Sequence, residues 1–317
     1  MWRSGRAAGA LLGGLPGALQ RRLSSGGPPW RLLFFGTDQF AVESLRALTC
    51  SRSSGAGLVR SVEVVTLPGD VPVRRFARQN RLTVHSWPPE LPGGRFDVGV
   101  VVSFGCLLQE SLIQQFPHGI LNVHPSLLPR WRGPAPIFHT ILQGDAVTGV
   151  TIIQILPHRF QRELGAIFRL FLSPTAPKIS AAMSWVVWEE QTCEQIARLH
   201  RAIGSRIPLR TLWMGRTVKL LEFAGRRPLS GQTQNAVPGS VHFQKESGAL
   251  AVRCMDGWVL FKAVLLKKRL TATDFYNGYL HQTLKKDTPH GAAEGRFISS
   301  RGGGADGARR RNESTPI

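Results

Sequence analysis

Asn122 and His124 carry the strongest chemical signal in the sequence. They stand at the end of an apolar run that begins at Gly119, and side chains two residues apart in a strand lie on the same face. Strand ends are also where open α/β sheets place their chemistry. An asparagine amide can donate a hydrogen bond to a developing oxyanion, and a histidine can move a proton near neutral pH. The pair therefore suits acyl transfer, and a structural Asn and His in a turn is the alternative.

Four motifs place this pair in a wider pattern. They are F-F-G-T-D-x-F-A at 34–41, N-x-H-P-S-L-L-P-R-W-R-G-P-A-P at 122–136, G-D-x-x-T-G-V-T-I at 144–152 and A-P-K-I-S at 176–180. Through these motifs the chain resembles the 10-formyltetrahydrofolate-dependent formyltransferases, and in detail those that act on methionyl-tRNA. The segment L-T-A-T-D-F-Y-N-G-Y-L at 270–280 is similar to the mitochondrial branch of that family.

The resemblance implies a role for each matched position. Asn122 would donate to the formyl oxygen, and His124 would stabilise or protonate the tetrahedral intermediate. The positions that match folate-contacting residues of the family are Phe104, Gly105, Ser126, Leu127, Leu128 and Pro129. Arg130 and Arg132 could meet the glutamate tail of the folate or the RNA backbone, because guanidinium groups suit both. Solvation of their loop is the alternative.

The family also has an Asp in a D-x-G turn shortly after the V-T-I strand, and this chain has none there. The nearest carboxylate is Glu163, in the sequence Glu163-Leu164-Gly165, which stands two positions late behind Gln161-Arg162. We therefore expect Glu163 to be a poor substitute for the third catalytic group, and a solvated surface glutamate is the alternative.

A second departure follows the strand expected at 167–172. Relatives continue with an amphipathic helix before A-P-K-I-S, whereas this chain reaches that motif directly through Ser173-Pro174-Thr175. A helix that would cover one face of the sheet is missing. We expect either that another element fills the space or that the chain is a variant product, such as a splice form, with a compromised first domain.

Composition adds evidence on partners and location. The net charge of +20 favours a polyanionic partner such as RNA or an acidic membrane surface. Residues 1–29 contain four arginines and no acid up to position 25, which is typical of a mitochondrial transit peptide and predicts the mitochondrial matrix. No apolar run reaches eighteen residues, so no membrane span is expected. The cysteines have no C-x-x-C spacing, so neither a metal nor a disulfide framework is expected: Cys50, Cys106, Cys193 and Cys254.

Short apolar runs alternate with amphipathic segments in the first half, which predicts a parallel sheet. The expected strands are 31–35, 62–66, 97–103 and 119–123, and the expected helices 40–48, 73–79 and 110–116. Gly36 and Gly105 belong to no G-x-G-x-x-G motif, so dinucleotide binding is disfavoured.

The second half changes in character from about residue 184. A helix is expected from a Thr192 cap to Gly204, followed by short strands at 218–223, 239–243, 250–254 and 258–266 that predict a small barrel. The resemblance implies that this barrel is OB-like and binds tRNA. Lys267, Lys268 and Arg269 could contact phosphates there, and protection of a strand edge by charge is the alternative.

The sequence thus predicts an α/β chain with an open, mostly parallel Rossmann-like formyltransferase domain followed by a small OB-like β-barrel. The expected divisions are a transit peptide at 1–29, a catalytic domain at 30–172, a linker at 173–183, a tRNA-binding domain at 184–290 and a disordered tail at 291–317. The resemblance implies a monomer that takes 10-formyltetrahydrofolate and initiator methionyl-tRNA. A non-catalytic RNA-binding remnant and a folate-dependent formyltransferase or hydrolase for a small molecule are the alternatives.

Overall fold

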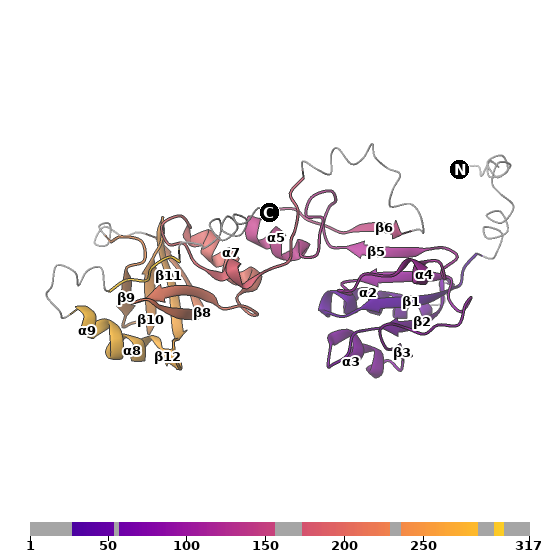
Figure 1. Cartoon of the computed structure of the whole chain (residues 1–317), viewed down its shortest axis with the longest axis horizontal. Coiled ribbons are helices and arrows are strands. Elements are labelled where there is room, and N and C mark those ends of the chain that lie inside the picture. The colour runs from indigo at the N-terminus through magenta and orange to yellow at the C-terminus, as the bar shows by residue number, and fades with distance from the viewer. Residues whose placement is uncertain (1–26, 54–56, 156–172, 229–235, 285–294, 301–317) are drawn as a thin grey trace, which may run out of the picture. The chain divides into compact units, whose positions relative to one another are not determined.

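The computed structural model describes residues 27–53, 57–155, 173–228, 236–284 and 295–300 (Figure 1). The chain divides into two compact units. The first consists of residues 1–130 and 149–174, and the second of residues 131–148 and 175–317. Within the described residues, no helix is both long and apolar enough to cross a membrane.

The first unit is built on a six-stranded sheet with the order β3-β2-β1-β4-β5-β6. Its parallel strands are β1 (Trp30–Gly36), β2 (Val59–Val65), β3 (Val84–His85), β4 (Val98–Val102) and β5 (Ile120–His124), and β6 (Thr151–Ile155) runs antiparallel to β5. The helices are α2 (Gln39–Ser53), α3 (Pro72–Gln79) and the short α4 (Glu110–Ile113). The predicted mostly parallel sheet is confirmed.

In the centre of this sheet, side chains on both faces are buried. Leu32 and Phe34 of β1 enter a core with α2 and α3, whereas Leu33 and Phe35 enter a second core with Phe104 and Ile120 on the opposite face. Alternation along the strand sends neighbouring side chains to opposite cores, which explains the continuous apolar run in the sequence. The carboxylate of Asp38 accepts a hydrogen bond from Ala41 N at 3.1 Å and so caps the start of α2.

At β6 the side chains of the sheet are more exposed than in its centre. Ile152 is 65% exposed and Ile153 37% exposed, although both belong to the strand. No described strand pairs with the outer edge of β6. The strand expected at 167–172 lies outside the described residues.

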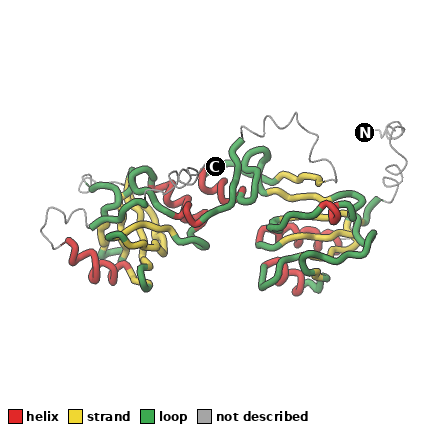
Figure 2. The backbone as a smooth tube through the Cα atoms, in the orientation of Figure 1, coloured by secondary structure: helices red, strands yellow, loops and turns green. Residues whose placement is uncertain are grey.

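The second unit contains a six-stranded antiparallel sheet, visible in yellow in Figure 2. Its strands follow the order β7 (Leu209–Trp213), β8 (Arg216–Pro228), β11 (Gly257–Leu265), β10 (Ala249–Arg253) and β9 (Val241–Gln244), and β12 (Arg269–Thr271) pairs with β11. Helical segments flank it: α5 (Pro136–Gln143), a 3-10 turn (Ala181–Ser184), α7 (Cys193–Ile203), α8 (Ala272–Phe275), a π-helical turn (Tyr276–Leu280) and α9 (His281–Leu284). The strands at residues 209–213 and 269–271 and the helices after 271 were not expected from the sequence.

Residues 296–298 close this sheet into a barrel. Ile298 bridges Leu212 of β7, and Arg296 bridges Ser240 immediately before β9, so one short segment pairs with both sides of the sheet. Phe297 between them is 1% exposed. The expectation of a disordered tail from residue 291 therefore does not hold for 295–300, because an apolar side chain in a polar, glycine-rich tail fills the core.

The predicted helix at 192–204 is confirmed as α7. The hydroxyl of Thr192 accepts from the backbone N–H of Gln195 at 3.1 Å, and the Gln195 side chain accepts from the backbone N–H of Thr192 at 2.8 Å. This reciprocal capping satisfies two donors that the helix leaves unpaired. Ile196, Leu199 and Ile203 are buried, as their spacing predicted.

The helix α5 departs from the expected domain division, because it packs against α7 of the second unit. Phe138, Ile141 and Leu142 contribute to the core of that unit. The guanidinium of Arg198 on α7 donates to the carbonyl of Gln143 at the end of α5 (3.1 Å). The chain passes from the first unit to the second after Pro174, and it also enters the second unit earlier, at 131–148.

Candidate active site

The carboxyl ends of β1, β4 and β5 meet at one edge of the first sheet, because these strands are parallel. The residues at this edge include Thr37 after β1, Phe104 and Gly105 after β4, and His124 at the end of β5. The Thr37 hydroxyl donates to the carbonyl of Phe104 at 3.0 Å and ties two of these ends together. This is the edge at which open α/β sheets bind ligands.

Asn122 and His124 lie on one face of β5, as the sequence predicted. Asn122 is paired with Val101 of β4 and Ile153 of β6, and His124 is paired with Thr151. Both are half-buried, whereas Ile120 on the same face is fully buried. Among the described residues, no hydrogen bond involves the side-chain amide of Asn122. The fold thus brings an amide and an imidazole together near the carboxyl edge of the sheet.

The S-L-L-P loop that follows β5 is held by its own hydrogen bonds. The buried Ser126 hydroxyl donates to the Arg130 carbonyl at 2.8 Å. The Thr151 hydroxyl donates to the Ser126 carbonyl (2.7 Å) and accepts from Leu128 N (3.1 Å). Leu127 is 49% exposed, and Leu128 and Pro129 are half-buried. Ser126 therefore shapes the loop, and Leu127 is the member of the segment most open to a ligand.

Phe104 and Gly105 differ in what they can offer a ligand. The Phe104 ring is 2% exposed and makes edge contacts with Phe35 and Trp87 at centroid distances of 5.6 and 5.0 Å. Gly105 is exposed and has φ of +83°, a conformation that side chains disfavour. The Phe104 ring supports the edge from within, and the backbone at Gly105 is the part that faces outward.

The W-R-G-P-A-P segment interlocks with two other motifs of the sequence. The Trp131 indole donates to the Asp145 carboxylate and stacks on His139 with ring centroids 5.6 Å apart. The backbone N–H of Ala176 donates to the Arg132 carbonyl at 2.8 Å, and a side chain on Gly133 would lie 2.7 Å from the Ala176 carbonyl oxygen. These contacts join the segment to two neighbouring parts of the second unit. Arg130 is exposed and Arg132 is half-buried.

The third group of the expected site is Glu163. It lies outside the described residues, so its role stays a prediction. The expected transit peptide also lies almost wholly outside them, since description begins at residue 27.

The expected basic cluster of the second unit is only partly on a strand. Lys267 and Lys268 are exposed in the turn between β11 and β12, and Arg269 begins β12 and forms an ion pair with Glu222 of β8. Sequence reasoning missed Arg227 and Lys245, which line one shallow hollow near β9. It also missed that the fold brings Cys193 and Cys254 together, because their separation of 61 residues leaves no local signal.

Family models and known proteins of similar sequence define the class to which this protein belongs. Residues 90–158 match the formyl transferase family model, and residues 178–280 match the model for the formyl transferase C-terminal domain. The mitochondrial methionyl-tRNA formyltransferase of Homo sapiens is 46% identical, covering 86% of this chain and 84% of that protein. A methionyl-tRNA formyltransferase of Coxiella burnetii is 38% identical over 143 residues, which is 39% of this chain and 44% of that protein. The chain belongs to the methionyl-tRNA formyltransferase family.

The length of the human alignment bears on the shortened segment. The alignment spans 329 positions, more than the 317 residues of this chain, yet it includes only 86% of them. The human protein therefore has residues in the aligned region that this chain lacks.

Among solved structures, HypX from Aquifex aeolicus is similar with a TM-score of 0.46 and 18% identity, covering 80% of this chain and 48% of that chain.

Proposed function

We propose that this chain transfers the formyl group of 10-formyltetrahydrofolate to the α-amine of initiator methionyl-tRNA. The observation that carries the proposal is the placement of Asn122 and His124 on one face of β5, at the carboxyl edge of the sheet, in a member of this family. Both side chains are half-buried, so each keeps part of its surface exposed.

The reaction needs the groups that this edge provides. The amine nitrogen attacks the formyl carbon, a carbon–nitrogen bond forms, and the formyl oxygen becomes an oxyanion. The Asn122 amide donates a hydrogen bond to that oxygen, and His124 stabilises the same intermediate. The bond from carbon to N10 of the folate then breaks, and N10 gains the proton that the attacking amine has lost. In the family a carboxylate assists that proton transfer, and Glu163 is the closest match to it in this sequence.

The folate would lie along the loop after β5. Leu127 is its most exposed apolar side chain, and the backbone at Gly105 is open on the neighbouring strand end. Arg130 is exposed at the end of the same loop and is suited to a carboxylate of the glutamate tail.

The tRNA would bind through the basic side chains of the second unit. Lys267 and Lys268 are exposed in one turn, and Arg227 and Lys245 line a hollow. Phosphate contacts of this kind position RNA without reading its sequence. Because the similar mammalian proteins are mitochondrial, we propose that the activity lies in the mitochondrial matrix. The chain is proposed to act as a monomer.

The exposed isoleucines of β6 favour one second candidate. A chain with an open first sheet and no family Asp would retain an RNA-binding second unit without catalysis. Such a non-catalytic remnant would bind tRNA but would not use the folate or form a product. The third reading, a formyltransferase for a small molecule, is disfavoured by the basic second unit.

A formylation assay on the purified chain tests the proposal. The assay supplies 10-formyltetrahydrofolate and methionyl-tRNA and measures formylmethionyl-tRNA, while calorimetry measures folate and tRNA binding separately. Formylated tRNA supports the proposed function. Binding of tRNA without folate binding or product would establish the remnant, and formylation of a small amine but not of tRNA would establish the third reading.

A further inference from the structure

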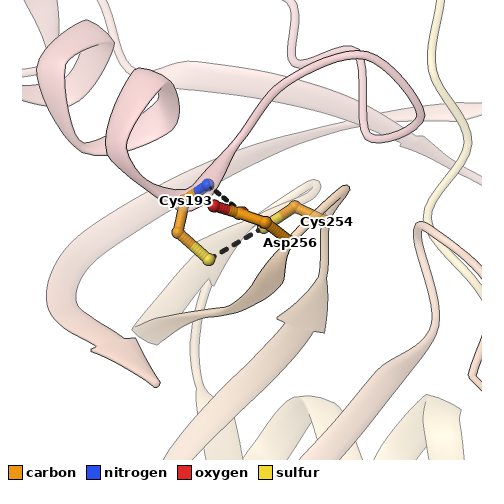
Figure 3. Close-up of side chains that lie close together, drawn as sticks. All are labelled: Cys193, Cys254 and Asp256. Carbon is orange, nitrogen blue, oxygen red and sulfur yellow. Dashed lines mark hydrogen bonds between the residues drawn. The ribbon is translucent and has the colours of Figure 1, made fainter. Parts of the chain in front are cut away.

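Two cysteines of the second unit form a close pair outside the candidate active site. Cys193 is the first residue of α7, and Cys254 directly follows β10 (Figure 3). Their sulfur atoms lie 3.1 Å apart and share a hydrogen bond. Both side chains are buried, Cys254 completely. Chain segments 61 residues apart thus present two thiols directly to each other.

The surrounding backbone holds this pair in place. The carboxylate of Asp256 accepts from the backbone N–H of Cys193 at 2.6 Å, which fixes the start of α7 to the turn after β10. The Cys254 sulfur donates to the Gly257 carbonyl at 3.3 Å. A side chain at Gly257 would lie 2.8 Å from the Cys193 sulfur, so the glycine makes room for it. The close approach is therefore built into the turn.

A small molecule can reach the pair from one side. Cys193 and Asp256 line a shallow hollow together with Arg226 and Arg227. Cys193 is 8% exposed, whereas Cys254 is fully buried. A hydroperoxide is small enough to enter such a hollow, whose lining includes two arginines and a carboxylate.

The spacing of the sulfur atoms favours a bond between them over a shared metal ion. Tetrahedral zinc with bonds of about 2.3 Å holds two thiolates about 3.8 Å apart. The observed 3.1 Å is shorter than that, and a disulfide requires a further approach of about 1 Å. Asp256, whose carboxylate lies near both sulfur atoms, already accepts a backbone hydrogen bond through Oδ1.

The contact between the thiols also alters their acidity. The hydrogen bond from Cys193 lowers the pKa of the Cys254 thiol, although burial acts in the opposite direction. The same contact, together with burial, raises the pKa of Cys193. The contact thus lowers the pKa of one thiol and raises that of the other. The thiolate is the form of a cysteine that reacts with peroxides.

We propose that Cys193 and Cys254 are a site of reversible oxidation that forms an intramolecular disulfide with hydroperoxides. One thiolate attacks the peroxide, breaks its oxygen–oxygen bond and becomes a sulfenic acid, and one water leaves. The second thiol then displaces a second water and forms the sulfur–sulfur bond. Two thiols and one hydrogen peroxide thus give one disulfide and two waters. A dithiol reductant reverses the change.

The test uses the full chain with Cys50→Ser and Cys106→Ser, which leaves only the pair. We expect hydrogen peroxide to lower the intact mass by two hydrogen atoms and to abolish thiol alkylation, and a dithiol to restore both. Peptide mapping should recover a link between residues 193 and 254. The matched control adds Cys254→Ala, in which no internal link can form.

Two results would overturn the proposal. One is a folded chain that keeps both thiols alkylatable at a peroxide concentration that oxidises the exposed Cys50 of the unsubstituted chain. The other is one zinc per chain after purification that is lost with Cys254→Ala, which would make the pair a metal site. The first measurement is made with the pair intact, so it does not depend on the folding of the control.

Discussion

The two units finish their sheets in opposite ways. In the second unit, residues 296–298 pair with both sides of the sheet, and every residue of β10 is buried. In the first unit, β6 pairs only with β5 among the described strands, and Ile152 and Ile153 are exposed. A strand with a bare outer edge contributes little burial and invites pairing with other chains. Among the described residues, the first sheet thus ends at an exposed strand that pairs on one side only, whereas the second sheet is closed by a further segment.

A core substitution should give the largest difference between the units. Phe297→Ala removes a ring that contacts Trp188, Trp213 and Phe275. We expect it to lower the free energy of unfolding of the second unit by about 3 to 5 kcal/mol. The matched change Ile152→Ala should cost the first unit less than about 0.5 kcal/mol, because the side chain is largely in solvent. Hydrogen exchange by mass spectrometry, resolved for β10 and β5, measures both.

Equal costs for these two substitutions would contradict the comparison. They would show that β6 is covered in solution and that the first sheet is as complete as the second.

If the exposed strand β6 leaves the carboxyl edge of the sheet intact, Asn122 and His124 should still contribute to turnover. Asn122→Ala and His124→Ala should each reduce turnover by roughly 10² to 10³, the scale of one lost oxyanion donor or acid–base group. His242→Ala, an exposed histidine of β9, is the control and should leave turnover within a factor of two or so. Steady-state formylation kinetics give the answer, and an active chain indifferent to both changes would refute the mechanism.

The position of the third catalytic carboxylate should affect activity more than whether the residue is Asp or Glu. We expect this chain to be about 10²-fold less active than an intact relative, since a displacement of about 1 Å at a catalytic group can have that effect. Glu163→Asp, which restores the family residue without the absent helix, should recover little of the loss. Side-by-side assays with a full-length relative test this expectation, and equal activities would show the chain to be unimpaired.

Charge on the second unit should have the smallest effect. Neutralising Lys267 and Lys268 should lower the magnitude of the log–log salt slope of tRNA binding by roughly 0.7 to 0.9 for each lost phosphate contact. Arg269→Ala should change the slope less, because Arg269 is already paired with Glu222. Binding titrations at several salt concentrations measure the slopes, and an unchanged slope in the double variant would assign the lysines to protection of the barrel.

The sequence predicted what local patterns determine. The buried strands of the first sheet, the shared face of Asn122 and His124, and the Thr192 cap each follow from residues a few positions apart. The strand β7 was missed although its alternating burial is a readable signal. The helix α5 was missed because it is short and lies between a proline-rich loop and a glycine.

Other features depend on contacts that no local pattern reveals. Phe297 stands in a glycine- and arginine-rich tail, and only the closure of the barrel makes it a core residue. Ser126 matched a folate-contacting position, but its hydroxyl is occupied by the Arg130 carbonyl. The Cys193 and Cys254 pair depends on a turn 61 residues away from the helix it meets. Sequence spacing cannot report such distant approaches.

The path of the chain sets a constraint on how the protein is made. The polypeptide leaves the first unit after Arg130, returns at Gly149 and leaves again after Pro174. The end of α5 and its partner Arg198 are 55 residues apart. At a synthesis rate of about 5 to 20 residues per second, the nascent α5 waits roughly 3 to 11 s for α7 to be made. Neither unit can therefore be completed from one uninterrupted stretch of the nascent chain, and a fragment that ends near residue 174 would carry α5 without its partner.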